Sequence, residues 1–489
     1  MDTAAESTPG PTTDTGPADV GSAGRRRLSD RAAALRRPVL DPYWLALGLF
    51  AAYATLSVCR YRRMETMSWD LGIFEQAIRG YAQLKAPVAD LKGPGANILG
   101  DHFSPVTALL APLYRLFPGP VTLLVAQAAL FALSAIPVTR IAARLLGRGR
   151  GLLIGVAYGF SWGVQRAVDF DFHEICFAVP LLAFALEAVL AERWLRAALW
   201  AAPLVLVKED MGATVAAIGT IMLIRTWRLR DSRVSLTAIG LIGFGVIAAA
   251  VALGVIIPAF NSGGSYDYWQ KMDSGTTTAT IPLDTALRTL AWVLLPTTGL
   301  LALRSPLLLA ALPTLGWRFV SHDDHYWGTD WHYNAVLMPV VFLALVDACD
   351  RSRRSPRAWL SGYARQLPVA VAGAALALSS SLPLYGLTVP DTYRKPDSVR
   401  AAEHLLATIP DGASVEANVP PISRLAHRCR VFWVGDTRGI TPDYLAFHED
   451  PPRTPQDMAD YARQLHPDAE YQYMGTAGGV YLLKLKGSR

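Results

Sequence analysis

Long apolar runs, separated by short polar connections, dominate the chain from residue 43 to residue 387. A helix of about 20 apolar residues crosses the hydrocarbon layer of a membrane, and shorter apolar helices pack inside a bundle or border a water-filled cavity. The pattern therefore predicts an all-α polytopic membrane bundle of about eleven transmembrane helices. The predicted spans fall near residues 43–59, 119–143, 151–167, 174–191, 195–207, 211–224, 235–259, 286–303, 306–320, 333–348 and 366–387.

The segment of residues 60–118, between the first two predicted spans, is more polar than the spans themselves. Within it, Leu71–Tyr81 carries apolar residues at helical spacing, which predicts an amphipathic helix lying along the membrane surface. We interpret this segment as a long first outer loop of a transmembrane domain that covers residues 42–390.

Residues 391–489 follow a different pattern, in which short helical and extended stretches alternate. Ser398–Ile409 and Thr454–Leu465 have helical spacing. Short apolar stretches between turn residues predict strands, at Ser414–Asn418, Val431–Val434, Tyr444–Phe447 and Val480–Leu485. This alternation predicts a small C-terminal α/β domain outside the membrane.

Arginine residues gather at every second connection between the predicted spans, and the positive-inside rule assigns such connections to the cytoplasm. The basic N-terminal segment, residues 1–41, is predicted to be disordered and cytoplasmic. With eleven spans the C-terminus then lies outside. We expect the protein in the plasma membrane. The same rule requires two spans in residues 195–224, because a single span would place the next arginines outside. The arginines concerned are Arg140, Arg144, Arg148, Arg150, Arg193, Arg196, Arg225, Arg228, Arg230, Arg233, Arg304, Arg351, Arg353, Arg354 and Arg357.

The composition supports a membrane class and argues against a nucleic-acid partner. Hydrophobic residues make up 52% of the chain and charged residues 18%, against roughly 25% charged residues in soluble domains. The net charge of +6 is explained by arginines that flank apolar runs. The four cysteines are scattered without paired spacing, which predicts neither a disulfide framework nor a cysteine zinc site.

Acidic and histidine residues crowd the connections predicted to lie outside, whereas the inner connections carry mostly arginine. Ionisable residues at the edge of a membrane bundle are candidates for a functional site, although polar turns also need polar residues. The outer clusters are Trp69–Gln76, Gly100–Pro105, Asp169–Glu174, Lys208–Asp210 and Ser321–Asn334.

Asp70 is the sharpest single candidate for catalysis. It follows the first predicted span, between Trp69 and an apolar stretch that would shield it from bulk water. A shielded carboxylate can act as a general base toward an incoming hydroxyl. The alternative interpretation is a helix N-cap, because Asp satisfies free backbone N–H groups at a helix start. The two roles are compatible, and the sequence does not decide between them.

The stretch Asp169–Glu174 resembles an acid/base or metal-ligand set. Asp171, His173 and Glu174 are candidate catalytic residues. Histidine and carboxylate side chains suit divalent metals such as Zn²⁺ or Mn²⁺, but a histidine in a turn is more often a hydrogen-bonded structural residue. We therefore assign no metal ligand, and a divalent metal stays open as a cofactor. Histidines that could join this set are His102, His322, His325 and His332.

Basic residues of the outer connections could hold a phosphate. Arg166, Lys208 and Arg318 are the cations best placed to meet a lipid-linked phosphate. Glu209 and Asp210 either orient Lys208 for that role or neutralise it in a local ion pair. Trp317 and Trp331 lie near the same predicted interface, where an aromatic belt explains such residues and where a sugar ring could stack on them.

Several ordered motifs together resemble a bacterial family of multi-pass membrane proteins known as DUF2079, over roughly residues 45–450. The layout is in turn similar to the GT-C superfamily of glycosyltransferases, and the Ala-, Gly- and Arg-rich composition resembles actinobacterial members. The motifs are Asp70-Leu71-Gly72-Ile73-Phe74-Glu75-Gln76, Asp101-His102-Phe103-Ser104-Pro105, Asp171-Phe172-His173-Glu174 and Lys208-Glu209-Asp210.

The resemblance implies an enzyme that transfers a sugar from a polyprenyl-phosphate carrier to an acceptor on the outer face of the membrane. Asp70 would occupy the position of the catalytic carboxylate of GT-C enzymes. The acidic pair Asp169 and Asp171 lies in a later loop than the DxD-like pattern of some members, so metal dependence is not implied. Candidate substrate-binding residues are Glu75, Gln76, Asp101, His102, Arg166, Lys208, Glu209, Asp210, His322, His325 and His332.

Two other classes of function compete with this hypothesis. A transporter or lipid flippase would need ionisable residues near the middle of the spans, often with inverted repeats, and in this sequence the charges keep to the ends of the spans. A non-catalytic cell-envelope assembly protein would carry exposed apolar patches on the C-terminal domain. The glycosyltransferase hypothesis requires that the outer clusters converge in space.

Overall fold

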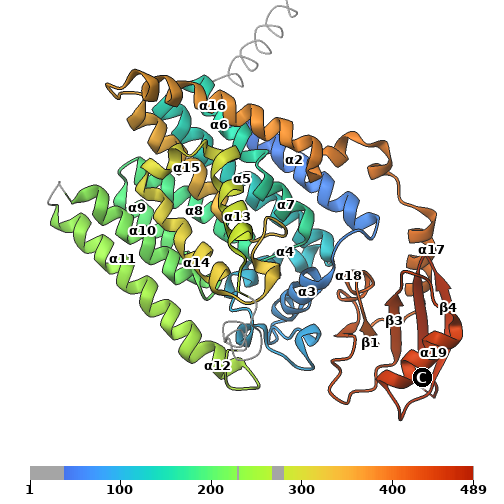
Figure 1. The fold of residues 1–489 in the computed structure, drawn as a ribbon. Coiled ribbons are helices and arrows are strands. Elements are labelled where there is room, and N and C mark those ends of the chain that lie inside the picture. Colours follow the sequence, from blue (N-terminus) through green and yellow to red (C-terminus); the bar gives the residue numbers. More distant parts are fainter. Residues whose placement is uncertain (1–37, 228–230, 267–279, 488–489) are drawn as a thin grey trace, which may run out of the picture. The chain divides into compact units, whose positions relative to one another are not determined.

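The computed structural model describes residues 38–227, 231–266 and 280–487. Residues 1–37 of the segment predicted to be disordered lie outside the described residues. Pro42–Arg489 forms one compact unit, which is mainly helical, with a small β-sheet near the C-terminus (Figure 1).

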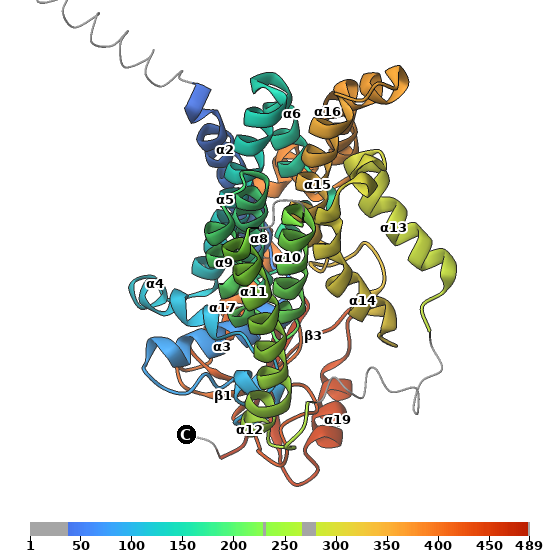
Figure 2. The same cartoon turned by 90° about the vertical axis from the view of Figure 1, so that its left-hand side faces the viewer.

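Helices account for most of the chain up to residue 378 (Figure 2). After α2 (Asp41–Arg62), the first outer loop contains α3 (Trp69–Ala82) and α4 (Ala111–Leu116). The remaining helices of this part are α5 (Pro120–Leu146), α6 (Arg148–Gly159), α7 (Trp162–Phe170), α8 (Ile175–Leu190), α9 (Trp194–Ala201), α10 (Met211–Thr226), α11 (Ser232–Val251), α12 (Ile257–Phe260), α13 (Leu283–Thr298), α14 (Leu312–Val320), α15 (Leu337–Ser352) and α16 (Ala358–Leu378).

Helical segments long and apolar enough to cross a membrane are Pro38–Arg62, Pro120–Leu146 and Ser232–Phe260. Several shorter apolar helices accompany them, so the count of about eleven spans remains a prediction. The two segments predicted within residues 195–224 are present as separate helices, because helix α10 begins only after a break at Val207–Asp210. The predicted span 151–167 is instead divided at Phe160–Ser161.

Close packing of the helices relies on small residues at their contacts. Helices α10 and α11 meet at Gly212 and Gly245, where a Cβ atom on Gly212 would lie 2.3 Å from the carbonyl oxygen of Gly245. Such close backbone approach is the usual means of helix association in membranes. At the centre of the bundle, α15 is buried on all sides from Leu337 to Cys349, which is consistent with an apolar sequence that only Asp347 interrupts.

The C-terminal part folds into a five-stranded sheet in the order β2-β1-β3-β5-β4. β1 (Ser414–Ala417) pairs in parallel with β2 (Arg430–Trp433) and β3 (Tyr444–His448), whereas β5 (Val480–Leu485) pairs antiparallel with β3 and β4. The strand β4 (Tyr471–Ala477) was not predicted. Helices of this part are α17 (Asp397–Leu406), α18 (Ile422–Leu425) and α19 (Pro455–Leu465), the last begun by a capping box at Thr454.

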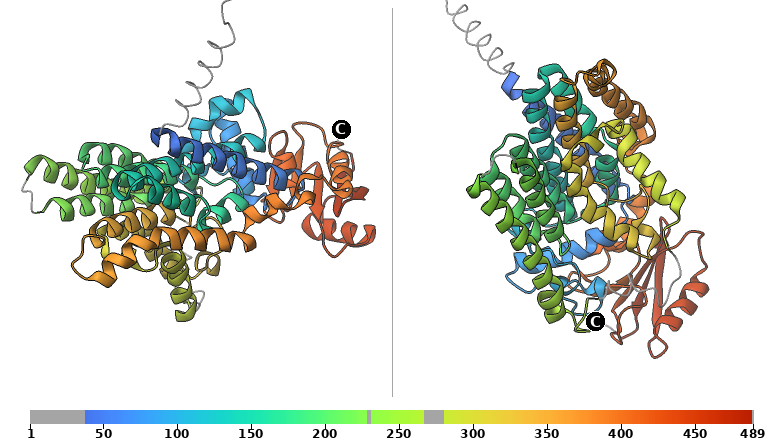
Figure 3. Two further views of the ribbon diagram at one scale, coloured as in Figure 1. Left: turned by 90° about the horizontal axis from the view of Figure 1, so that it is seen from above. Right: turned by 60° about the vertical axis from the view of Figure 1, so that its left-hand side comes forward.

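The C-terminal sheet is fastened to the first outer loop (Figure 3). The Gln76 side chain donates to the carbonyl oxygen of Val431 (2.9 Å) and accepts from the backbone N–H of Leu91 (3.2 Å). Arg430 forms two hydrogen bonds with the Asp90 carboxylate, each 2.9 Å long. Helix α3 therefore forms where the sequence predicts a helix, and other parts of the protein cover most of it. Its position along the membrane surface stays a prediction.

Candidate functional site

A cavity of about 670 Å³ opens where the predicted outer connections meet. Its walls come from segments far apart in the chain, so the outer clusters do converge in space. The lining residues are Met67, Trp69, Asp70, Lys92, His102, Phe170, His173, Lys208, Glu209, Asp210, Leu253, Tyr266, Trp317, Ser321, Asp323, His325, Tyr326, Trp331 and Tyr333.

The first turn of α3 carries Asp70 to the cavity wall. The helix begins at Trp69, and Ser68 occupies the cap position with a left-handed backbone at φ 64°. Asp70 therefore lies inside the first turn rather than at the N-cap. In the first turn its charge still interacts favourably with the positive end of the helix. Removal from bulk water raises the pKa of Asp70 to about 6, although His102 lowers it. Such a carboxyl can exchange a proton near neutral pH.

Residues of the C-terminal part hold this first turn in place. The Ser68 hydroxyl donates to the Ser423 hydroxyl at 2.8 Å, and the ring of Trp69 packs edge-to-face on Trp433 with 4.4 Å between ring centroids. A left-handed non-glycine residue persists only where its surroundings determine it, often at a functional site. Strand β2 and helix α18 thus fix the backbone that presents Asp70.

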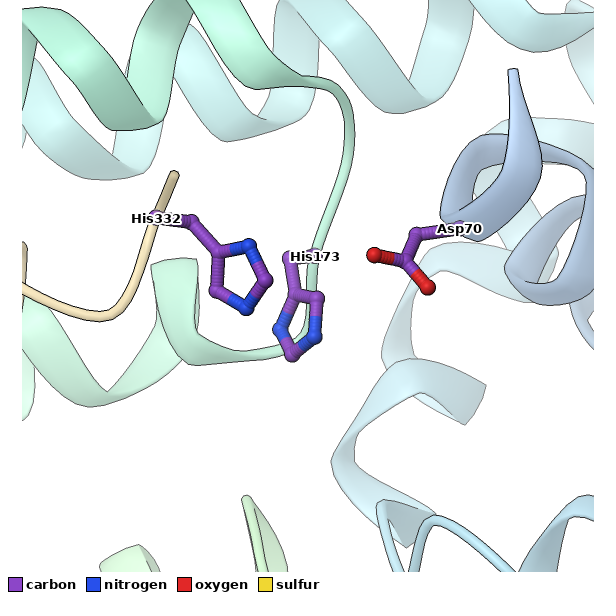
Figure 4. A group of neighbouring side chains, drawn as sticks. All are labelled: Asp70, His173 and His332. Carbon is purple, nitrogen blue, oxygen red and sulfur yellow. The ribbon is translucent and has the colours of Figure 1, made fainter. Parts of the chain in front are cut away.

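His173 and His332 lie beside Asp70 (Figure 4). Their rings stack with 3.7 Å between centroids, and they are 3% and 2% exposed. Burial lowers the pKa of both imidazoles well below the usual range, so both are neutral near neutral pH. Neither ring nitrogen of His332 has a hydrogen-bond partner among the described residues. The Nδ1 atom of His173 lies 2.7 Å from Oε2 of Glu174, in a poor alignment for a hydrogen bond.

The loop between α7 and α8 carries two further buried carboxylates, Asp171 and Glu174, which are 1% and 0% exposed. Gln127 of helix α5 fixes the loop backbone: its amide nitrogen donates to the carbonyl oxygen of Asp171, and its oxygen accepts from the N–H of His173. Burial, and then the neighbouring Asp70, raise the pKa of Asp171 well above its usual range.

Lys208 supplies a cation to the same cavity. Burial would lower its pKa, but Glu209, Glu174 and Asp210 outweigh burial and raise it above the usual range. Lys208 therefore stays charged, and its Nζ atom lies 5.3 Å from the centre of the Trp317 ring. The Glu209 carboxylate accepts a hydrogen bond of 2.7 Å from the Tyr266 hydroxyl.

A second charged group lies on the side of the first outer loop. The Asp101 carboxylate is 2.5 Å from Nδ1 of His102 and 3.1 Å from Nζ of Lys92. Burial would raise the pKa of Asp101, but His102 and Lys92 outweigh it and hold the pKa well below the usual range. For His102, burial would lower the pKa, but Asp101 raises it. The group thus presents cationic donors to the cavity.

Some predicted site residues do not line the cavity. Glu75 accepts a hydrogen bond from Tyr114 (2.9 Å) inside the first outer loop, and Gln76 bonds to the C-terminal sheet. Arg166 lies near Asp169 on α7, and His322 is outside the lining. The structure thus gives Glu75 and Gln76 partners inside the protein, and their role as substrate-binding residues stays a prediction.

Other cavity residues were given no role from the sequence. Lys92 and Tyr266 line the cavity but lie outside the outer clusters, whereas Tyr326 and Tyr333 belong to the cluster Ser321–Asn334. Only the expected convergence of the outer connections could have pointed to them.

Arg318 was expected to meet a phosphate, but its guanidinium holds the loop before α15. It is fully buried and donates to the carbonyl oxygens of Tyr326 (2.7 Å) and Gly328 (2.8 Å), and to the side chain of Asn334 (2.9 Å). That loop carries His325, Trp331 and His332. Arg318 therefore helps to hold the loop in the cavity wall, together with the hydrogen bonds of Trp327 to Thr289 and Ser321.

Replacing Arg318 with Met should destabilise the protein by about 2–5 kcal/mol, because three buried acceptors lose their donor. The measurement is thermal unfolding of the detergent-purified protein, and we expect a clearly lower midpoint. Arg304→Met, at an exposed arginine, is the matched control and should leave the midpoint almost unchanged. Equal midpoints for the two variants would contradict the role assigned to Arg318.

Comparison with known proteins agrees with this architecture. A family model described as "Predicted membrane protein (DUF2079)" matches residues 60–480. The chain belongs to the DUF2079 family. This DUF2079 member is therefore embedded in a membrane, whereas the sides assigned to its termini and its actinobacterial origin remain predictions. No curated protein matches its sequence.

Solved structures with the same fold include two of ArnT from Cupriavidus metallidurans. The structure of ArnT bound to undecaprenyl phosphate matches at a TM-score of 0.54 and 13% identity, covering 90% of this chain and 97% of ArnT. The apo structure matches at a TM-score of 0.52 and 12% identity, covering 85% and 93%. At this identity the likeness concerns the fold alone, which this DUF2079 member shares with ArnT.

Proposed function

We propose that this protein is a glycosyltransferase that moves a sugar from a polyprenyl-phosphate carrier to a hydroxyl acceptor on the outer face of the membrane. The observation that carries the proposal is the single cavity shared by the Asp70 carboxylate, the Lys208 cation and several aromatic rings. Its fold is also that of ArnT, which has been captured with undecaprenyl phosphate. A volume of about 670 Å³ is within the usual range of small-molecule sites.

The reaction needs a base for the acceptor hydroxyl and a cation for the leaving phosphate. The acceptor oxygen attacks the anomeric carbon of the sugar, and the bond between that carbon and the phosphate oxygen breaks. Asp70 takes the proton from the acceptor hydroxyl as the general base. The carrier phosphate leaves with the bonding electrons, and Lys208 stabilises the charge that develops on it. Glu209 and Asp210 keep Lys208 charged.

Aromatic side chains form the remaining walls and suit a sugar ring. Trp69, Trp317 and Trp331 line the cavity together with Tyr326 and Tyr333. Their flat apolar faces pack against the C–H face of a sugar, while indole N–H and phenol O–H groups bond to its hydroxyls.

The direct test is sugar transfer by purified protein reconstituted in lipid. The protein is incubated with a panel of polyprenyl-phosphate sugars that carry a radioactive label, together with an extract of envelope glycans and lipids as acceptors. Time-dependent transfer of label from one donor is the expected result. If folded protein transfers label from no donor, the proposal fails, and transport or envelope assembly becomes the leading interpretation.

The contact between the C-terminal part and α3 should affect the rate of transfer. Trp433→Ala removes the ring on which Trp69 rests, and a misplacement of Asp70 by about 1 Å can cost up to roughly 100-fold in rate. We expect kcat to fall at least about tenfold, with little change in KM for the donor. Met474→Ala, an exposed position on β4, is the control within the same sheet. A Trp433→Ala variant with the wild-type kcat would contradict the positioning role.

A further inference from the structure

Three side chains from distant parts of the chain gather beside the cavity: Asp70 and His173 line it, and His332 stacks on His173. Asp70 comes from the start of α3, His173 from the loop between α7 and α8, and His332 from the loop before α15. Each offers one ligand atom, and these atoms all lie within 4.8 Å of one another. Figure 4 shows the Asp70 carboxylate directed toward the two stacked imidazole rings.

Several buried polar atoms in and beside this cluster lack hydrogen-bond partners, which costs free energy. His332 is 2% exposed, and neither of its ring nitrogens has a partner among the described residues. Both oxygens of Asp171 and both oxygens of Glu174 likewise lack well-aligned partners. Leaving a buried polar group unsatisfied costs about 1–3 kcal/mol, and more for a charge. A ligand that carries positive charge and accepts lone pairs would satisfy these buried groups.

The balance of charge around the cluster points the same way. The basic groups electrostatically coupled to it are Arg60, Lys92, His102 and Lys208, and acidic groups outnumber them. The acidic groups are Asp70, Asp101, Asp169, Asp171, Glu174, Glu209 and Asp210. A bound divalent cation would offset this excess of buried carboxylates.

We propose that Asp70, His173 and His332 bind a divalent transition-metal ion, with Zn²⁺ the best fit. Two imidazoles and one carboxylate are a ligand set that zinc takes in sites with an open fourth position. Hard cations such as Mg²⁺ and Ca²⁺ prefer oxygen ligands throughout. Zinc-bound ligand atoms in a tetrahedron lie about 3.3 Å apart. The three side chains therefore draw together by rotation when the ion binds.

Glu174 completes the arrangement as an orienting residue. A histidine that binds a metal through one nitrogen usually directs its other nitrogen at a carboxylate, and Nδ1 of His173 lies 2.7 Å from Glu174. This contact leaves the other ring nitrogen of His173, Nε2, as the one available to bind the ion.

The metal site extends beyond the proposed sugar transfer and does not depend on it. The Asp70 carboxylate has two oxygens, so one can bind the ion while the other remains for the acceptor proton. The open position of the ion faces the cavity, where a phosphate or hydroxyl oxygen could occupy it.

Metal binding by the full-length protein tests the inference without any donor sugar. The protein is purified with an affinity tag that contains no histidine, stripped with a chelator, and titrated with ZnCl₂ against a fluorescent zinc indicator. We expect about one tightly bound Zn²⁺ per chain. Co²⁺ in place of Zn²⁺ should give the intense visible absorption of a tetrahedral site.

Matched histidine variants locate the ion. His332→Ala and His173→Ala should each weaken Zn²⁺ binding by more than about tenfold, and Glu174→Gln by about 10- to 100-fold. His404→Ala, on the exposed face of α17, should bind like the wild type. His325→Ala tests the exposed cluster of Asp323, Asp324 and His325 and should also bind like the wild type.

Thermal unfolding checks that each variant folds. His332→Gln keeps a polar group of similar size and should lose zinc affinity as His332→Ala does. The inference is overturned if the wild type binds no stoichiometric zinc, if His332→Gln and the wild type bind equally, or if zinc is lost with His325→Ala instead.

Discussion

Replacing Asp70 with Asn is expected to lower the rate of sugar transfer by about 10²–10⁴-fold, the usual contribution of a general base. Asn has the same shape as Asp but cannot accept the acceptor's proton at neutral pH. The first turn of α3 and its contacts with Ser423 and Trp433 do not involve the carboxylate, so the fold should persist. The measurement is kcat with the donor found in the panel.

A matched control comes from a similar position on another helix. Asp284 also lies in the first turn of its helix, α13, and is exposed. Asp284→Asn should transfer at the wild-type rate. An Asp70→Asn variant with the wild-type unfolding midpoint and full activity would contradict the assignment of Asp70 as the base. Zinc binding separates the two roles of this residue, because His332→Gln removes the ion's ligand and keeps the Asp70 carboxylate.

Removal of the Lys208 charge should have the second largest effect. Lys208→Met is expected to lower kcat by about 10²–10³-fold, because the developing charge on the leaving phosphate loses its stabilising cation. Ground-state binding of the donor should weaken as well. The measurement is steady-state kinetics over a range of donor concentrations, with Lys85→Met, at an exposed lysine of the first outer loop, as the control.

Lys208→Met also leaves Glu209, Glu174 and Asp210 without the cation coupled to them, and this could disturb the fold. Lys208→Arg avoids the problem because it keeps the charge. It should retain far more activity than Lys208→Met, although the planar guanidinium has a different geometry. Equal kcat values for wild type, Lys208→Met and Lys208→Arg would exclude the role in leaving-group stabilisation.

The helices and their connections could be predicted because the physics that sets them is local. A run of apolar residues forms a helix in a membrane whatever surrounds it, since its backbone must satisfy its own hydrogen bonds. Arginine placement divided residues 195–224 into two segments, and helices α9 and α10 have this arrangement. Whether the outer loops converge in space could not be predicted from the sequence, because convergence depends on how the helices pack against one another.

The roles of individual polar residues could not be predicted, because they depend on tertiary contacts. Glu75 and Asp70 belong to one motif, yet Asp70 faces the cavity while Glu75 bonds to Tyr114. Likewise His322, His325 and His332 share one loop, but only His332 stacks on His173. A helix turns successive side chains by about 100°, so neighbours in a motif face different surroundings.

Strand β4 was missed for a different reason. Its sequence, Tyr471–Ala477, does alternate between intermediate and exposed residues, but it contains a glycine and few β-branched residues. Pairing with β5 rather than intrinsic preference makes it a strand, as is common for edge strands.

The bond between Ser68 and Ser423 joins positions 355 residues apart in the chain. A ribosome adds about 5–20 residues per second. The segment that bears Asp70 therefore leaves the ribosome roughly 20–70 s before the segment that locks it. During biosynthesis the protein would pass through a stage in which every helix is inserted and the first turn of α3 is still loose. Competence for transfer then arrives only after α18 and β2 are made, and a chain terminated before them would reach the membrane but remain inactive.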